Sequence, residues 1–453
     1  MSYQFSKYET HYRNLTYLGV PIIIGQLGNL ILNFADTLMI GHHSTEELAA
    51  AAFVNNMFTL VIIFAIGFTY AITALVGILY GQDKTHRIGE VMKSATAANT
   101  CMAILLSVIM IVLYLNIHRL GQPEELLPLI RPYFLIQLVS LPFVCWFNTF
   151  RQFTDGITDT KVAMWILVAG NVMNIFGNWI LIYGHLGLPE LGLIGAGLST
   201  MISRIVMAIV MVSIFFFSKK YSEYKKGWGM GSVKYADFKK ITVLGIPLAL
   251  QMGMETAAFS LSSLMVGWFG TESLAAHQVM LTISQLGYMI YYGLAAAVAV
   301  RISNFMGQRD YLAVRRTATA GIHLVFLLAI LTSVPIFICR HIIGGLFTDN
   351  VNVISMVSMT IIPFMIYQFG DGLQCNYANA MRGTANVRPL IWIAFISFFV
   401  VSLPLGYLFG VVMNYQLVGV WYAFPFGLTL SGILYYIYYQ KGLKKIEDAS
   451  SSK

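Results

Sequence analysis

The sequence contains the same stretch twice. Residues 19–50 read GVPIIIGQLGNLILNFADTLMIGHHSTEELAA, and residues 245–276 read GIPLALQMGMETAAFSLSSLMVGWFGTESLAA. The two stretches align without a gap at an offset of 226, which pairs Pro21 with Pro247. Each is a long apolar run with few polar residues in its interior, followed by a short polar segment. The chain is therefore built from two related halves.

The match between the halves extends well beyond this stretch. It continues without a gap to residues 81–82 and 307–308, which both read Gly-Gln. Further along, GITDTKVAMWI (156–166) matches GTANVRPLIWI (383–393) at an offset of 227. Chance matches would not keep a shared offset over this distance. Two halves in the same orientation, related by an axis along the membrane normal, are one form of transporter repeat.

The composition excludes a soluble protein. Of the 453 residues, 57% are hydrophobic and only 11% are charged, and the mean hydropathy is +0.71. Typical soluble proteins carry roughly 25% charged residues. A porin-type barrel is excluded too, because its strands alternate polar and apolar residues, whereas the apolar runs here are long and continuous. The sequence predicts an all-α integral membrane protein.

The apolar runs predict twelve transmembrane helices, six in each half. We place them near residues 15–39, 47–80, 92–116, 127–151, 162–183, 192–218, 240–267, 273–300, 317–339, 351–381, 389–413 and 418–440. The predicted organisation is an N-terminal lobe at 1–218, a basic cytoplasmic linker at 219–239 and a C-terminal lobe at 240–453. We expect the lysine-rich linker to be solvated, with contact to anionic lipid as a secondary role.

The basic residues orient these helices. With the N-terminus inside, 24 of the 28 Lys and Arg residues fall on the inner side, which is the bias expected of cytoplasmic segments. Only Arg119, Arg131 and Arg340 fall outside, and Arg204 lies within a span. The same bias explains the net charge of +8 without nucleic acid. We expect both termini to be cytoplasmic, in a bacterial inner membrane.

Three acidic residues lie well inside the predicted spans: Asp36, Glu255 and Asp371. A charge near the bilayer centre costs about 2.5 to 3.5 kcal/mol on insertion scales, so such residues mark functional sites. Asp36 corresponds to Ser262 in the repeat, and Glu255 corresponds to Asn29. Positions 29 and 36 are two helical turns apart, so each half carries an acid on about the same helix face. The alternative for Asp36 is that it only caps the outer end of its span.

Asp371 stands between Gly370 and Gly372, and Tyr367 precedes it by one helical turn. Glycines on both sides let the backbone or a ligand approach closely and permit local unwinding of the helix. Carboxylate and phenol oxygens suit Na⁺, and a buried acid can also carry a proton. Asp371 and Tyr367 are therefore candidate cation ligands, and Glu255 is a second intramembrane acid in the same half. Residue types alone leave Na⁺ and H⁺ both open.

The first half has a polar cluster of its own, with Asn171, Asn174 and Asn178 on one helix. Together with Asp36 and Thr200 they are predicted to form a second polar cavity. The alternative is that the asparagines only make hydrogen bonds between helices.

Other polar and aromatic residues have weaker interpretations. Arg204 is either a partner for an acid or a snorkelling residue, and His277 is expected to be structural. Tyr288, Tyr291 and Tyr292 cluster on one span, where aromatic faces attract organic cations, although interfacial aromatic belts explain most tyrosines. The cysteines are expected to be packing residues, since they show no metal or disulfide pattern: Cys101, Cys145, Cys339 and Cys375.

These motifs, taken together and in duplicate, resemble the multidrug and toxic compound extrusion (MATE) family over essentially the whole chain. The resemblance is carried by GVPIIIGQ with ADTLMIG, GIPLALQM with LMVGWFGTESLAAHQV, the YGQ and MGQ ends of spans 2 and 8, and GITDTK. The sequence is most similar to the NorM-like branch. In that branch the acids of spans 7 and 10 are matched here by Glu255 and Asp371, and the tyrosine by Tyr367. The resemblance therefore implies a coupling-cation site at Glu255, Asp371 and Tyr367, with Glu255 and Asp371 as the Na⁺ ligands if the ion is Na⁺.

The resemblance implies two six-helix lobes and secondary antiport, in which Na⁺ or H⁺ entry drives the export of lipophilic organic cations. Asp36, Asn174 and Asn178 match the N-lobe polar site of the family, while another branch has an aspartate at the position of Asn178. We expect no resident cofactor, with Na⁺ or H⁺ as coupling ion. The expected partners are small organic cation drugs and membrane lipid, with no nucleic acid, and the expected state is a monomer.

Three other functions would each need a feature that the sequence lacks. A flippase of lipid-linked oligosaccharides would need a cationic cavity, whereas the predicted spans hold three acids and one arginine. A membrane-embedded enzyme would need a nucleophile or metal set, and no HExxH, paired-histidine or Ser-His-Asp pattern appears. A channel would need a filter-like segment. The sequence therefore predicts a transporter that is not an enzyme.

Overall fold

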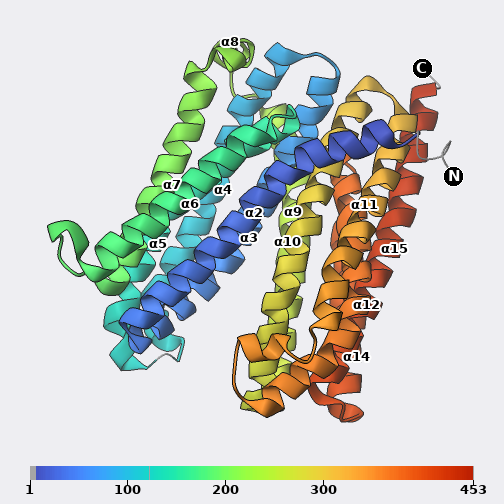
Figure 1. The fold of residues 1–453 in the computed structure, drawn as a ribbon. Coiled ribbons are helices and arrows are strands. Elements are labelled where there is room, and N and C mark those ends of the chain that lie inside the picture. The colour runs from blue at the N-terminus through green and yellow to red at the C-terminus, as the bar shows by residue number, and fades with distance from the viewer. Residues whose placement is uncertain (1–6, 122, 452–453) are drawn as a thin grey trace. The chain divides into compact units, whose positions relative to one another are not determined.

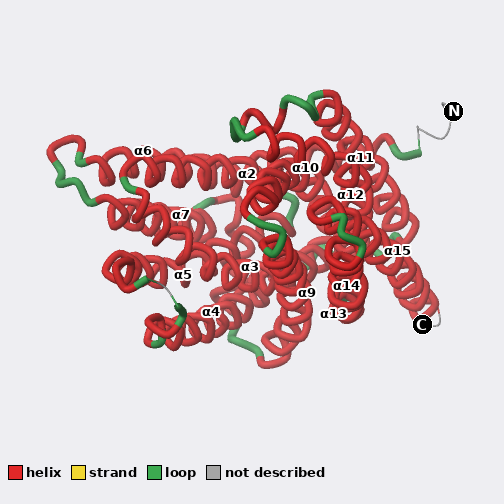
Figure 2. Tube along the Cα trace, turned by 90° about the horizontal axis from the view of Figure 1, so that it is seen from below, coloured by secondary structure: helices red, strands yellow, loops and turns green. Residues whose placement is uncertain are grey.

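The computed structural model describes residues 7–121 and 123–451, and every regular element in these ranges is a helix (Figure 2). Twelve of the described helices are long and apolar enough to cross a membrane, which confirms the predicted number. Most are longer than the apolar runs that predicted them, because each helix continues past the apolar run into polar residues at one or both ends.

The first half contains six long helices (Figure 1): α2 (Glu9–His43), α3 (Thr45–Gly81), α4 (Thr85–Leu115), α5 (Leu127–Gly156), α6 (Thr160–Tyr183) and α7 (Gly192–Phe217). The second half contains five: α9 (Tyr235–Gly267), α10 (Thr271–Gln308), α11 (Tyr311–Ile338), α12 (Val351–Gly383) and α15 (Gln416–Ser451). Single 3₁₀ turns lie in the connections: η1 (Ile117–Arg119), η2 (Glu124–Leu126), η3 (His185–Gly187), η4 (Lys219–Tyr221) and η5 (Ile343–Leu346).

The remaining span, residues 388–412, is not a uniform α-helix. It begins as α13 (Arg388–Ala394), widens to a π-helix (η6, Phe395–Ser402), returns to α14 (Leu403–Tyr407) and ends in a second π-helix (η7, Leu408–Val412). Pro404, in the α segment between the two π stretches, has no backbone N–H to donate. Local π geometry is one way in which a membrane helix keeps its other backbone groups bonded around a proline.

The chain forms two compact units that do not follow its order. The N-terminal unit runs from Ile24 to Ala249, and the C-terminal unit combines the described residues before Ile24 with those after Ala249. The boundaries therefore fall inside α2 and α9, at positions that correspond in the repeat. The lobe boundaries predicted at residues 219–239 stay a prediction.

Equivalent contacts, at corresponding positions of the repeat, hold the start of α2 in the C-terminal unit and the start of α9 in the N-terminal unit. A Cβ added to Gly293 of α10 would lie 2.6 Å from the side chain of Ile23 in α2. A Cβ added to Gly67 of α3 would lie 2.8 Å from the Cα of Ala249 in α9. The two glycines are 226 positions apart, and so are Ile23 and Ala249, which is the offset of the repeat. The start of each half's first helix thus packs on the second helix of the other half.

The linker contains a helix that the charge pattern did not predict, α8 (Ser222–Met230). Its lysines are exposed, as predicted, but Tyr221 and Tyr224 are buried and pack edge-on against Phe153 of α5. Burial raises the pKa of Tyr224 to about 12. The protonated Tyr221 hydroxyl donates to Asp159 over 2.5 Å. The linker is therefore fixed to the N-terminal unit by its aromatic face.

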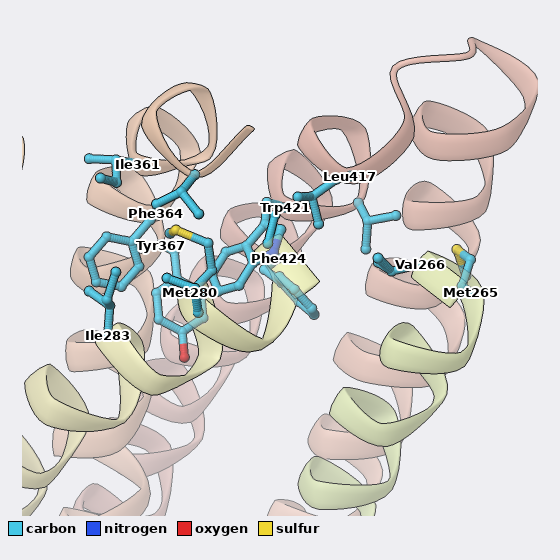
Figure 3. Packing of buried hydrophobic residues seen from close by; sticks show 14 of the residues in the cluster. Met265, Val266, Met280, Ile283, Ile361, Phe364, Tyr367, Leu417, Trp421 and Phe424 are labelled. Carbon is cyan, nitrogen blue, oxygen red and sulfur yellow. The ribbon is translucent and has the colours of Figure 1, made fainter. Parts of the chain in front are cut away.

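An apolar cluster of the C-terminal unit lies between α9, α10, α12 and α15 (Figure 3). The Tyr367 ring lies in this cluster, 5.8 Å from both Phe364 and Trp421 between ring centroids. In Figure 3 the Tyr367 hydroxyl points out of the labelled apolar group. Apolar packing thus fixes the ring, while the hydroxyl remains available for a polar contact.

Candidate functional site

The structure brings the three predicted coupling-site residues into one polar network in the C-terminal unit. The amide nitrogen of Gln374 donates to Glu255 Oε1 over 2.9 Å, and Gln374 also interacts with Asp371. Both Tyr291 and Tyr367 direct their hydroxyls at the Asp371 carboxylate, and Tyr291 donates to Oδ2. Tyr291 and Gln374 were not predicted as members of the site.

Helical spacing explains how these residues meet. Tyr367, Asp371 and Gln374 follow one another on α12 at intervals of four and three residues, so their side chains share one face. Glu255 comes from α9 and Tyr291 from α10. The spacing therefore contained a signal for Gln374, whereas only the packing of α10 against α12 reveals Tyr291.

The glycines beside Asp371 serve close helix packing, as predicted. A Cβ on Gly370 would lie 2.7 Å from the Thr429 hydroxyl of α15, and one on Gly372 would lie 2.7 Å from Val325 of α11. Residues 370–372 are α-helical within α12, so the helix is not unwound at this point in the structure.

The network continues from Glu255 to an arginine that the sequence analysis had assigned to an inner loop. The amide nitrogen of Gln251 donates to Glu255 Oε2 over 3.2 Å, and its amide oxygen accepts from Arg382 Nη2 over 2.9 Å. Arg382 lies in the last turn of α12 and only 5% of it is exposed. The loop assignment was wrong because α12 extends past the end of its apolar run.

The donor set suits a hard monovalent cation. Glu255 and Asp371 supply carboxylate oxygens, and the two tyrosines supply hydroxyls. The amide oxygen of Gln374 is buried without a hydrogen-bond partner among the described residues. Oxygen ligands of this kind fit Na⁺. In the described ranges no group of three or more His, Cys, Asp or Glu side chains is arranged to hold a metal ion.

The polar residues of the N-terminal unit are also joined, but by separate hydrogen bonds. The Asn178 amide donates to Asp36 over 2.5 Å, and the Asn174 amide donates to the Thr200 hydroxyl over 3.2 Å. Both asparagines are fully buried, and their amide oxygens have no hydrogen-bond partner among the described residues. Asp36 is thus a member of a polar cluster within the unit and does not merely cap a helix end.

The third asparagine has a different partner. Asn171 donates to Asn29 of α2 over 3.3 Å. Asn29 is the position that corresponds to Glu255 in the repeat, so the first half places an amide where the second half has an acid. Hydrogen bonds between α2, α6 and α7 therefore account for the amide nitrogens of the three asparagines, but not for the unpartnered amide oxygens of Asn174 and Asn178.

Of the two predicted roles of Arg204, the structure rules out snorkelling, and the acid within electrostatic reach of the guanidinium is Asp36. Its Nη1 donates to the Gln137 amide oxygen over 2.7 Å and to the Ser140 hydroxyl over 2.8 Å. Both acceptors are neutral and belong to α5, so the guanidinium is held inside the unit and does not snorkel.

His277 is structural, as predicted, and the structure defines its protonation. Trp421 Nε1, which can only donate, bonds to His277 Nδ1 over 3.0 Å, so this nitrogen must be an acceptor. His277 Nε2 lies 2.9 Å from the Ser263 hydroxyl and is the nitrogen that carries the proton. The ring is fully buried and neutral.

The N-terminal unit contains a buried charge pair that was not predicted from the sequence. Asp155 and Arg151 lie near the end of α5, 3.8 Å apart, and both are largely buried. The predicted span ends at residue 151, which leaves Asp155 outside the membrane-spanning helix. The helix instead continues to Gly156.

The cysteines divide into two pairs. Cys145 and Cys375 are buried, which agrees with the packing role predicted for them. Cys101 and Cys339 are exposed, so packing inside the protein does not explain them, and that part of the prediction is wrong.

Comparison with known families matches both halves of the chain. The MatE family model covers residues 21–180 and 247–408, one match in each half. The chain belongs to the MatE family. It is a NorM-like transporter of that family and crosses the membrane many times, so the resemblance inferred from the motifs is confirmed.

MatE relatives of known name span nearly the same length. The chain is 29% identical to the probable multidrug resistance protein NorM of Photorhabdus laumondii subsp. laumondii, over 94% of both chains. It is 27% identical to the protein of the same name from Mannheimia succiniciproducens, over 99% of this chain and 98% of that protein.

Solved structures show the same MatE fold. A mutant of the Vibrio cholerae MATE transporter VcmN superposes with a TM-score of 0.88 at 17% identity, covering 97% of this chain and 98% of that one. A MOP superfamily transporter from Pyrococcus furiosus, described as having a binding pocket of reverse polarity, gives 0.86 at 18% identity over 96% of each chain. The fold is therefore shared by transporters whose pockets differ in polarity, and cargo must be argued from the residues.

Proposed function

We propose that the protein is a secondary active multidrug efflux antiporter. It exports lipophilic organic cations in exchange for Na⁺ or H⁺, by alternating access of its two lobes. The observation that carries this proposal is the junction of Glu255 and Asp371 through Gln374, surrounded by tyrosines. The names of the relatives support drug export. The proposal also takes both termini to be cytoplasmic and the membrane to be a bacterial inner membrane.

The mechanism that we propose is mutual exclusion. The buried carboxylate of Asp371 and the half-buried one of Glu255 attract either the coupling cation or a cationic drug, and they cannot fully neutralise both. The rings of Tyr288, Tyr291 and Tyr367 add faces that attract an organic cation, worth roughly 0.5 to 2 kcal/mol per contact. Binding of Na⁺ or H⁺ at Glu255 and Asp371 would then favour drug release. Asp36, Asn174, Asn178 and Thr200 are proposed as a second polar site that contacts the drug.

The proposal is tested by ethidium efflux from energised vesicles, with Na⁺ and pH gradients imposed separately. Removing a charged partner from a desolvated site costs about 1.5 to 3 kcal/mol, which is roughly a tenfold to hundredfold change in affinity. Glu255→Gln and Asp371→Asn should therefore lose coupled efflux at low cation concentration. Wild-type coupled rates in both variants would remove these acids from the mechanism.

The same vesicles identify the coupling ion. Efflux that responds to a Na⁺ gradient with the pH gradient collapsed assigns Na⁺, and the converse assigns H⁺. The flippase alternative predicts no ethidium movement with either gradient. The net negative charge of the buried network around Glu255 disfavours that alternative, since the cargo of such a flippase is anionic.

A further inference from the structure

The buried charges of the C-terminal network do not balance. Glu255 and Asp371 contribute two negative charges, and Arg382 contributes one positive charge at the other end of the same hydrogen-bonded chain. Asp371 is 1% exposed and Arg382 is 5% exposed, so water does little to screen them, whereas Glu255 is half-buried. With both acids ionised, the network carries a net charge of −1.

The buried charges of the N-terminal unit, in contrast, cancel. Asp36 lies near enough to Arg204 for their charges to interact, and Asp155 lies 3.8 Å from Arg151. The buried Asp237 bonds to Arg87 over 2.5 Å. Each of these three acids thus faces an arginine. This unit needs no added cation to reach neutrality, whereas the C-terminal network needs one.

We propose that Arg382 is the fixed counter-ion that limits the C-terminal site to one monovalent cation. Leaving an uncompensated charge buried is strongly destabilising, so the bound state of lowest free energy is the one in which the network is neutral. One Na⁺ or one H⁺ achieves this, and a second would leave a buried positive charge. The inference rests on the proposed coupling site at Glu255 and Asp371, and it assigns that site its stoichiometry.

The geometry shows how Arg382 acts on a site that it does not touch. Its guanidinium has only donors, so it binds the oxygen of the Gln251 amide and turns the amide nitrogen towards Glu255. Arg382 also lies in the last helical turn of α12, where the helix dipole favours a positive charge. Arg382 is therefore a positioning residue as well as a counter-charge.

The repeat shows that this charge is specific to the second half. At the offset of 227 that aligns GITDTK with GTANVR, Arg382 corresponds to Asp155. Both precede a glycine that packs against the second long helix of the same half: Gly156 against Val76, and Gly383 against Ile302. Equivalent backbone positions thus carry opposite charges, and the two units differ in their demand for a cation.

The test counts cations on the purified protein. Bound Na⁺ is measured by equilibrium dialysis with radiolabelled Na⁺ at alkaline pH, and bound protons by difference titration in Na⁺-free potassium buffer. The doubly neutral variant Glu255→Gln/Asp371→Asn provides the baseline. Relative to it, the wild type is expected to bind one cation, Glu255→Gln none, and Arg382→Gln two.

Two further variants separate charge from folding. Arg382→Gln/Glu255→Gln restores the net charge of −1 and should regain the one cation that Glu255→Gln loses. Arg382→Lys keeps the charge and should also bind one. Arg388→Gln, an exposed arginine five residues after Gly383, should behave as the wild type.

The outcomes distinguish this inference from the function on which it rests. A stoichiometry of one in Arg382→Gln, or no recovery in the double variant, overturns the role of Arg382 while leaving the coupling site intact. A wild type that binds no more cation than the doubly neutral variant overturns the proposed coupling site itself. If Arg382→Gln does not fold, the double variant and Arg382→Lys still decide the question.

Discussion

At the scale of single residues, uncharged hydrogen-bond donors hold the acids of the C-terminal network. Tyr291 donates to Asp371, while Gln251 and Gln374 donate to the two oxygens of Glu255. Such donors keep a carboxylate in place without neutralising it. Each is therefore expected to tune cation binding through one hydrogen bond.

Tyr291→Phe tests this expectation. Loss of a hydrogen bond to a charged group costs about 1.5 kcal/mol or more, so coupled efflux at low cation concentration should fall roughly tenfold. Efflux is measured in vesicles as a function of the driving gradient. The matched control is Tyr439→Phe, because Tyr439 is buried in the same unit and donates to the backbone carbonyl of Val314 instead of an acid. Equal effects of the two variants would contradict the role of Tyr291.

His277→Ala should affect stability and not coupling. The substitution leaves the indole N–H of Trp421 buried without an acceptor, which costs about 1 to 3 kcal/mol before the lost packing is counted. The melting temperature of the purified protein should fall. The pH dependence of the remaining efflux should stay that of the wild type, because a neutral ring carries no coupling proton. A shifted pH profile would contradict the structural role.

Which site residues could be predicted depended on where they lie in their helices. Asp36, Glu255 and Asp371 were predictable because a charge within an apolar run is costly and therefore conspicuous. Arg382 and Asp155 were not, because they follow the apolar run, where charges are ordinary. Only the length of α12 and α5 shows that both residues are buried.

At the scale of single elements, α8 shows how a basic linker can be ordered. Two glycines bring it against α4: a Cβ on Gly227 would collide with the backbone carbonyl of His86, and one on Gly89 with that of Tyr224. The backbones of α4 and α8 are therefore in direct contact.

Gly227→Ala is expected to loosen α8. Overpacking of this kind costs about 1 to 3 kcal/mol, so cleavage by trypsin at Lys225 and Lys226 should become faster and the melting temperature should fall. Gly229→Ala is the matched control, since a Cβ there meets no atom within 4 Å. Equal protease sensitivity of the two variants would show that the contact does not order the linker.

Hydropathy predicted the number of spans but not their internal geometry. The twelve apolar runs are visible because each must cross the same hydrocarbon thickness. The π segments within residues 388–412 leave no such signal, since they change the hydrogen-bond pattern and not the composition. The buried tyrosines of the linker were not predicted, because its many lysines indicate a solvated segment.

At the scale of the whole molecule, the two units share α2 and α9, so any motion of one unit against the other must pass through these helices. Both cross their unit boundary two residues after a proline, Pro21 and Pro247. Proline removes one interior hydrogen bond and kinks a helix. The sequence predicted the two halves from the repeat, but the exchange of helix starts depends on tertiary contacts that sequence similarity does not contain.

Pro21→Ala and Pro247→Ala should slow efflux while leaving drug affinity nearly unchanged. Restoring a regular helix interior is worth about 3 kcal/mol, which would stiffen the shared segment and reduce the rate at least tenfold. Efflux rate and equilibrium ethidium binding are measured in parallel. Pro335→Ala serves as the control, because α11 lies wholly within one unit. Unchanged rates in both variants would exclude these prolines from the motion.

The position of Trp421 has a practical consequence. Its indole is fully buried, bonded to a neutral histidine, and 5.8 Å from the ring of Tyr367, whose hydroxyl contacts Asp371. An ion arriving at that carboxylate changes the electric field at a natural fluorophore. Emission from this indole offers a label-free optical signal for occupancy of the site.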